Sequence, residues 1–287
     1  MINHLNNNNM KRILLSVLAL TAALSTFAQN QQEWKLPYPE TTVYKGEDLE
    51  IRQIDEHTWH GNGKIMSNEA IYIIEGEEKA IVLDAGTSIK DYDKIVAQIT
   101  SKPVTLIATH VHPDHTGSAI NYFDEIYINA ADMVNVAAMM PDYKGTIKYL
   151  SDGQVIDLGG REIEVIFAPG HTPGSTLFMD KAAGYGFSGD AFGSGYLLLF
   201  TNFSTLELTS QRTLEYMKKH NITKMYPGHY MGLNADTQDR VEKCLQISRD
   251  VLAGKLTGVE SKQPRVGLEM QIIQEGITIN YGETAIK

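Results

Sequence analysis

Four side chains that can bind a metal ion lie within six residues of this sequence: His110, His112, Asp114 and His115. Alternate residues of an extended segment point to the same side, so His110 and His112 can face a common point. Pro113 ends the extended geometry, and the turn after it lets Asp114 and His115 point elsewhere. Imidazole and carboxylate groups suit zinc and iron. Because the chain has only nine histidines, this density predicts a metal site.

Three further candidate ligands follow predicted strands elsewhere in the chain. His171 lies between Pro-Gly and Thr-Pro-Gly, Asp190 follows Ser-Gly, and His229 follows Pro-Gly. Each of these segments by itself is typical of turn chemistry. Together with the first group they supply enough ligands for two metal ions.

The order of these residues, preceded by Leu-Asp-Ala-Gly at 83–86, resembles the metallo-β-lactamase superfamily over about residues 43–255. The resemblance implies an α/β fold, the αββα sandwich, in which two mixed β-sheets pack together with helices outside. It also implies that the metal site lies at one edge of the sandwich. Within the superfamily the sequence is most similar to the glyoxalase II and lactonase branch.

The resemblance also implies a role for each ligand. One metal is expected on His110, His112 and His171, the other on Asp114, His115 and His229, with Asp190 bridging the two. Asp84 is expected to order the ligand loop, and we count Asp84 and Asp114 as candidate catalytic residues. The expected cofactors are two divalent ions, with zinc ahead of iron or manganese, and no organic cofactor.

Two close cations lower the pKa of bound water, so a metal-bridging hydroxide is the expected nucleophile. Asp114 is expected to pass a proton to the leaving group. Zinc β-lactamases carry Cys or Ser where this chain has Asp190, and the diiron oxygen reductases carry Glu in place of His112. An ester, thioester or lactone is therefore the expected substrate. The alternatives are β-lactamase or phosphodiesterase activity at the same site, or a metal-binding module without turnover.

The elements that position these residues follow from hydrophobic periodicity and turn signals. Strands are predicted at 49–54, 70–75, 79–83, 104–109, 125–129, 163–168, 176–179, 185–188 and 224–226, with a terminal hairpin at 268–274 and 277–281. Helices are predicted at 91–100, 204–220 and 236–253. Cys244 lies on the apolar face of the last helix and is expected in the core. No repeat or linker divides the chain, so residues 43–287 are expected to form one hydrolase domain.

Two segments are candidates for substrate selection. Residues 59–68 connect early strands where the family carries a loop over the site. Residues 191–200 contain an apolar run that is either a substrate wall or part of the core. His57, His60 and His220 lie outside the motifs and are expected not to bind metal, and His60 is the one expected to reach substrate.

The N-terminal residues predict export. Lys11 and Arg12 precede an uncharged apolar run at 13–24, and small residues follow at 26 and 28. This pattern predicts a signal peptide over 1–28, cleaved after Ala28, and a tether over 29–42. The run is too short to span a bilayer. The expected location is the periplasm or the outside of the cell.

Composition limits the partners. The 287 residues carry a net charge of −10, and the predicted leader contains no acidic residue, so the remaining chain is more acidic still. An acidic surface argues against nucleic acid or an anionic membrane as the partner, once the leader is removed. The expected partner is a small-molecule substrate, and the oligomeric state is left open. With one cysteine, no intramolecular disulfide can form.

Overall fold

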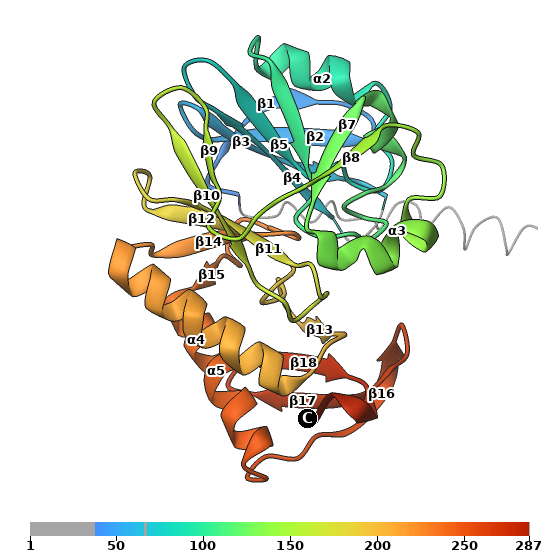
Figure 1. Cartoon of the computed structure of the whole chain (residues 1–287), viewed down its shortest axis with the longest axis vertical. Coiled ribbons are helices and arrows are strands. Elements are labelled where there is room, and N and C mark those ends of the chain that lie inside the picture. Colours follow the sequence, from blue (N-terminus) through green and yellow to red (C-terminus); the bar gives the residue numbers. More distant parts are fainter. Residues whose placement is uncertain (1–37, 66–67, 287) are drawn as a thin grey trace, which may run out of the picture. The chain divides into compact units, whose positions relative to one another are not determined.

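The first half of the fold is an eight-stranded sheet with its strands in sequence order (Figure 1). Strands β1 to β5 are antiparallel neighbours, and β5 to β8 run parallel. A parallel pair needs a crossover connection, and α2 (Tyr92–Ile99) provides it between β5 and β6. The strands are β1 (Thr41–Lys45), β2 (Leu49–Asp55), β3 (Thr58–Gly63), β4 (Ala70–Glu75), β5 (Ala80–Leu83), β6 (Val104–Ile107), β7 (Glu125–Ile128) and β8 (Thr146–Tyr149).

A six-stranded mixed sheet packs against the first, in the order β15-β14-β12-β11-β10-β9. Tyr72 of β4 and Phe187 of β12 pack together in the core between the sheets, with ring centroids 4.8 Å apart and ring planes tilted by 55°. The strands are β9 (Val155–Asp157), β10 (Glu162–Phe167), β11 (Thr176–Asp180), β12 (Tyr185–Gly189), β14 (Lys224–Pro227) and β15 (Asp236–Thr237). The helices α4 (Phe203–His220) and α5 (Gln238–Leu252) pack in a separate core with this sheet. The predicted αββα sandwich of two mixed sheets is therefore confirmed.

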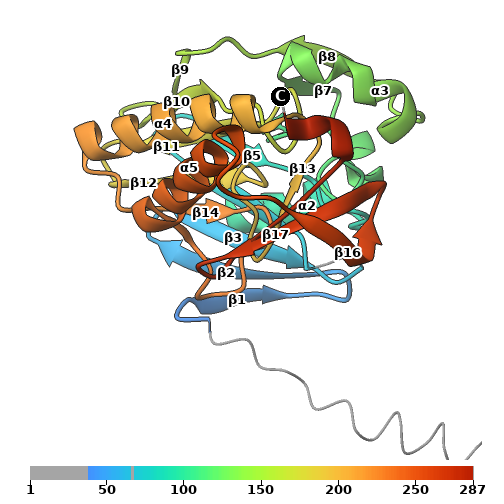
Figure 2. The ribbon, with the colours of Figure 1, turned by 90° about the horizontal axis from the view of Figure 1, so that it is seen from below.

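A third, four-stranded sheet follows the order β13-β18-β17-β16. The predicted terminal hairpin is present as β17 (Leu268–Gln274) and β18 (Ile277–Tyr281). Two strands that the sequence analysis did not find extend it, β13 (Leu197–Leu199) and β16 (Val259–Arg265). Figure 2 shows this sheet beside α5, and both share one hydrophobic core.

Residues 59–68 were expected to form a loop over the site, and the prediction is wrong for residues 59–63. They belong to β3, which lies between β2 and β4 and is buried at all six positions. The glycines in this segment indicated a loop, but Gly61 has a packing role. A Cβ there would lie 2.9 Å from the side chains of Leu49 and Ile71, closer than carbon atoms pack.

The structure is a computed structural model that describes residues 38–65 and 68–286. The predicted signal peptide and most of the tether lie outside these ranges, and export stays a prediction. The folded unit begins at Tyr38, and β1 begins at Thr41, before the predicted domain start at 43, because this segment pairs with β2. Within the described ranges, none of the helices has the length and apolar character to span a bilayer. Cys244 is buried in α5 as predicted.

Candidate metal centre

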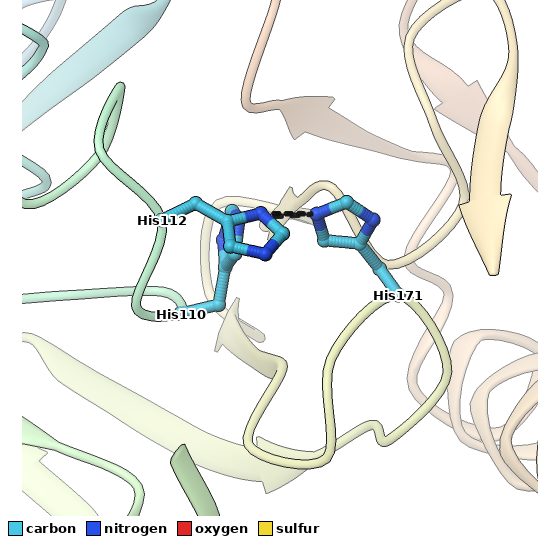
Figure 3. A group of neighbouring side chains, drawn as sticks. All are labelled: His110, His112 and His171. Carbon is cyan, nitrogen blue, oxygen red and sulfur yellow. Dashed lines mark hydrogen bonds between the residues drawn. The ribbon is translucent and has the colours of Figure 1, made fainter. Parts of the chain in front are cut away.

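Three imidazoles meet at one point and form what we call the three-histidine cluster, His110, His112 and His171 (Figure 3). Nε2 of His110 lies 3.2 Å from Nδ1 of His112 and 3.2 Å from Nε2 of His171. The remaining pair, His112 Nδ1 and His171 Nε2, is 2.9 Å apart. Tetrahedral zinc at about 2.0–2.1 Å from each nitrogen holds its ligands roughly 3.3 Å apart. The three nitrogens are therefore spaced for a single small cation.

The ligand loops meet because of where their strands end. His110 follows β6, and His171 lies in the loop between β10 and β11. β12 and β14 are parallel neighbours, so their carboxyl ends lie at one edge of the sheet. Asp190 and His229, which come directly after these two strands, are brought together by that pairing.

Hydrogen bonds on the far side of two rings set their tautomers. His171 donates from Nδ1 to the carbonyl oxygen of Leu198 over 2.7 Å. His110 donates from Nδ1 to Oγ1 of Thr109 over 3.1 Å, because the Thr109 hydroxyl itself donates to Asp84. In both rings Nε2 is thus left with a lone pair that faces the cluster.

The three rings are neutral at neutral pH. Burial lowers the pKa of His110 well below its ordinary value, and the neighbouring rings of His115 and His171 lower it further. Burial also lowers the pKa of His112 to about 4 and lowers the pKa of His171. Neutral imidazole is the form that binds a metal ion.

Asp114, His115 and His229 form a second group, the mixed cluster. Oδ2 of Asp114 lies 3.5 Å from Nε2 of His229 and 3.9 Å from Nε2 of His115. His115 donates from Nδ1 to Oδ2 of Asp84 over 2.8 Å, which turns Nε2 toward the cluster. That Nε2 is buried and has no hydrogen-bond partner among the described residues. A buried unpaired nitrogen is unfavourable unless something else binds it, and a cation fits this position.

Asp190 lies between the two clusters. Its Oδ2 is 3.7 Å from His171 Nε2 of the three-histidine cluster and 3.3 Å from His229 Nε2 of the mixed cluster, while Oδ1 is 3.7 Å from His115 Nε2. Burial acts to raise the pKa of Asp190, but His229 and His115 hold it well below its ordinary value. The carboxylate is therefore charged and faces both groups. Gly228 permits this approach, since a Cβ there would lie 2.2 Å from Oδ1 of Asp190.

The clusters open into a cavity of about 920 Å³ that is lined in part by Asp114, Asp190 and His229. A family model of the metallo-beta-lactamase superfamily matches residues 67–229, more than half of the chain. The chain belongs to the metallo-beta-lactamase superfamily.

Relatives in this superfamily include thioesterases. The acyl-coenzyme A thioesterase MBLAC2 of Gallus gallus is 27% identical over 207 residues, which cover 58% of this chain and 74% of that protein. The atrochrysone carboxyl ACP thioesterase dmxR1 of a Cryptosporiopsis species is 28% identical over 184 residues, covering 59% and 51%. Membership in the superfamily and these relatives make the chain a metal-dependent hydrolase.

Solved structures of the superfamily share the fold. A metallo-beta-lactamase from Pontibacter korlensis superimposes with a TM-score of 0.56 at 18% identity, covering 70% of this chain and 99% of that one. A metallo-beta-lactamase family protein from Thermus thermophilus gives a TM-score of 0.54 at 17% identity, covering 70% and 82%. At these identities the likeness concerns the fold alone.

Asp84 forms hydrogen bonds with the residues that carry or bind the metal ligands and does not itself face the cavity. Its Oδ1 accepts from the Thr109 backbone N–H at 2.7 Å, and its Oδ2 accepts from the Thr109 hydroxyl and from His115, each at 2.8 Å. Asp84 is buried and does not line the cavity. It was predicted both to order the ligand loop and to be catalytic; its hydrogen bonds are those that a positioning residue needs, and both roles stay predictions. Asp114, in contrast, lines the cavity.

The sequence analysis missed a second positioning residue, Asp132. Its Oδ2 accepts from the Val111 N–H at 2.8 Å and from the Thr172 hydroxyl at 2.9 Å, and Oδ1 accepts from the Gly174 N–H at 2.7 Å. Asp132 therefore joins the loop that carries His110 and His112 to the loop that carries His171. No local pattern indicates this, because the partners lie 21 to 42 residues away in sequence.

Residues 191–200 contribute both to the core and to the wall of the cavity. Leu197 and Leu199 are buried in the core, whereas Tyr196, Leu198 and Phe200 line the cavity. The alternation follows from β13, because successive strand residues point to opposite sides.

His60 does not reach the cavity, so the prediction that it approaches substrate is wrong. It is fully buried in β3, with Nε2 3.7 Å from Glu40 and its ring 5.1 Å from that of Tyr230. His57 faces Glu75 at 3.4 Å, and the ring of His220 lies 4.4 Å from that of Tyr216. The structure places all three histidines outside both ligand clusters.

Proposed function

We propose that this protein hydrolyses a small-molecule carboxylic thioester or ester at a centre of two zinc ions. The observation that carries the proposal is the position of Asp190, whose carboxylate lies between two groups of candidate ligands. A carboxylate between two cations offsets their mutual repulsion and favours the roughly 3.5–4 Å separation used in two-metal hydrolysis.

The residues present fit two zinc ions. The three-histidine cluster would hold one, the mixed cluster would hold the other, and Asp190 would bind both. When bound, such ions lower the pKa of a water molecule and polarise a carbonyl oxygen. The protein supplies neutral, pre-oriented imidazoles at the first position and carboxylates that balance charge at the second.

Asp114 is the residue that we assign to proton transfer. It lines the cavity, and its side chain is 16% exposed, so substrate can reach it. Oδ2 faces His229 at 3.5 Å, which leaves Oδ1 to accept the proton that the attacking water loses and to pass it to the departing thiolate or alkoxide.

The choice of a thioester or ester rests on two supports. MBLAC2 and dmxR1 are named as thioesterases, and their reaction is the hydrolysis of an acyl group from a thiol. Asp190 stands where zinc β-lactamases carry Cys or Ser, which disfavours β-lactam cleavage. Lactones contain the same acyl–oxygen bond as open-chain esters and belong to the same substrate class.

The test combines metal analysis with a substrate panel. We expect about two zinc ions per chain by elemental analysis after reconstitution. The panel contains thioesters, esters, acyl-homoserine lactones, β-lactams and phosphodiesters, with His112→Ala/His171→Ala as the inactive control. Turnover of thioesters or esters supports the proposal. A single metal at full activity, or turnover confined to β-lactams or phosphodiesters, would overturn it, and tight metal binding without any turnover would favour a metal-binding module.

We also propose that residues 1–28 direct export of the enzyme. The support is the basic pair Lys11 and Arg12, the apolar run at 13–24 and the small residues before the expected cleavage site. Leu18→Arg should interrupt the apolar run and keep the protein in the cytoplasm. Cell fractionation and N-terminal sequencing of the product check this, and a cytoplasmic wild-type protein that retains residues 1–28 would contradict it.

A further inference from the structure

The tip of one hairpin reaches the cavity from outside the family match. Arg265, the last residue of β16, and Val266, in the turn before β17, line the cavity, whereas the superfamily model ends at residue 229. Arg265 pairs with Leu268, so Val266 and Gly267 form a two-residue turn. A segment outside the family match therefore borders the proposed active site.

Val266 is an unfavourable residue for that turn. Its φ is +44° and that of Gly267 is +81°. Two-residue hairpin turns with positive φ at both positions strongly prefer Asn-Gly, and a β-branched residue rarely adopts such a φ. The valine side chain is also 74% exposed. Neither the turn nor the core benefits from valine here, which indicates a role in the cavity that it lines.

Contacts with residues 191–200 hold the hairpin tip at the cavity. The guanidinium of Arg265 lies 4.0 Å from the centroid of the Tyr196 ring and donates to its hydroxyl over 2.6 Å. A cation over an aromatic face is attracted to it. The tip is thus anchored to the segment that follows Asp190.

The other walls of the cavity are also apolar and solvent-exposed. The short helix α3 (Met133–Met139) has no buried residue, and its Val134, which lines the cavity, is 75% exposed. Phe200 lies beside the metal site, with its ring 5.4 Å from that of His112 and 5.5 Å from that of His171. Figure 1 and Figure 2 both show α3 and the β16 end of the small sheet on the same side of the molecule. The apolar surface is therefore continuous with the ligand clusters.

We propose that this apolar surface binds the acyl chain of the substrate, and that Val266, Val134 and Phe200 favour a substrate with an extended acyl chain over an acetyl ester or thioester. The proposal rests on the hydrolase function proposed above. With the reacting carbonyl at the metal clusters, an acyl chain has the space between the hairpin tip and α3 to occupy. Each methylene that it buries there raises kcat/KM by up to about fourfold.

The experiment compares S-acetyl- and S-octanoyl-N-acetylcysteamine, which share one small thiol. For the wild type we expect kcat/KM at least about tenfold higher on the octanoyl substrate. Val266→Asn places the preferred residue in the turn, so the melting temperature should stay equal or rise. The same variant should raise KM for the octanoyl thioester about fivefold, and its effect on the acetyl thioester should be smaller, because that acyl group is shorter.

Val259→Asn is the matched control, because Val259 lies in β16, the strand that leads to Val266, is 65% exposed and does not line the cavity. It should change neither substrate's kinetics. Equal effects of Val266→Asn on both substrates, or a wild type without preference for octanoyl, would overturn the proposal. A lower melting temperature with activity lost on both substrates would mean that Val266 has only a structural role.

Binding of octanoate, measured by calorimetry, separates this proposal from the proposed function. Octanoate that binds the wild type more tightly than Val266→Asn, in a protein that hydrolyses neither thioester, would support the acyl site and contradict the thioesterase reaction. Turnover of both thioesters with no difference in octanoate binding would support the thioesterase reaction and contradict the acyl site.

Discussion

The two ligand clusters of this protein differ in how closely their ligand atoms are spaced. In the three-histidine cluster the facing nitrogens lie within 3.2 Å of one another, and His110 and His171 are each 2% exposed. In the mixed cluster the facing atoms are 3.5 to 3.9 Å apart, and the side chains of Asp114 and His229 are 16% and 18% exposed. The first group is the more closely spaced and the second the looser one, and both border the cavity, through His112 and His171 in the first and through Asp114 and His229 in the second.

The clusters also differ in charge. The rings of the three-histidine cluster are neutral because burial lowers their pKa values. Burial acts to lower the pKa of His115 and of His229 as well, but Asp84, Asp114 and Asp190 raise the first well above its ordinary value, and Asp190 raises the second. The comparison indicates that closely spaced neutral imidazoles would bind a cation at the first site, whereas the carboxylates of Asp114 and Asp190 would balance its charge at the second.

The largest effect is expected at Asp190, which the two clusters share. Asp190→Ser removes the charge that faces both, so the second metal should bind more weakly and the rate should fall by at least about two decades, or roughly 2.7 kcal/mol of barrier. The protein should stay folded, because the three histidines and the core are unchanged. Metal stoichiometry and the rate on the best thioester at saturating zinc measure this.

Asp239→Ser is the control for that change, since the Asp239 side chain is 72% exposed on α5, where it pairs with Lys243. It should leave metal content and rate unchanged. An Asp190→Ser protein with two tightly bound zinc ions and the wild-type rate would show that Asp190 is not the bridging ligand.

A smaller and more selective effect is expected from removing one ligand of each cluster. His229→Ala should keep about one zinc through dialysis against a chelator, because the closely spaced three-histidine cluster is intact. His112→Ala should lose both ions under the same dialysis, because only the more loosely spaced mixed cluster remains complete. Elemental analysis before and after dialysis checks this, and identical retention in the two variants would remove the distinction between the clusters.

Asp84 and Asp132, the two buried aspartates that support the ligand loops, should have effects of intermediate size on metal affinity. Asp84→Asn disturbs His115 directly and His110 through Thr109, so it should weaken zinc binding at both clusters by about tenfold or more. Asp132→Asn disturbs only the loops of the three-histidine cluster and should weaken that site alone. Competition titration with a zinc-binding dye resolves the two affinities. An Asp132→Asn protein that lost affinity at the mixed cluster, or an Asp84→Asn protein that lost it at neither, would contradict this assignment.

The smallest effect is kinetic and needs no mutation. Chelator added to the two-zinc protein should remove metal in two phases, the mixed cluster first, because its ligands are more exposed. Activity should be lost with the first phase. Stopped-flow detection of released zinc alongside residual rate measures this, and a single phase would indicate that both ions are held alike.

Much of the architecture could be predicted from sequence, since strongly periodic segments define the long helices and the strands of the sandwich. The predicted helix at 204–220 is α4 (Phe203–His220), and the predicted hairpin matches β17 and β18. The failures were elements without clear periodicity. The segment that forms β3 was expected to be a loop because it contains Gly61 and Gly63, although it pairs with a neighbouring strand on each side and is buried.

The amino-acid sequence was sufficient to identify the residues that can bind metal, because histidines and carboxylates at strand ends and in glycine-rich turns are visible as local spacing. Only the folded chain shows how they are held and what surrounds them. Asp132 joins two loops, Leu198 sets the tautomer of His171, and Val266 borders the cavity from a hairpin beyond the last ligand. Each of these contacts joins residues that lie far apart in the chain. They depend on how strands and loops pack, and packing leaves no periodic signal in the sequence around any one of these residues.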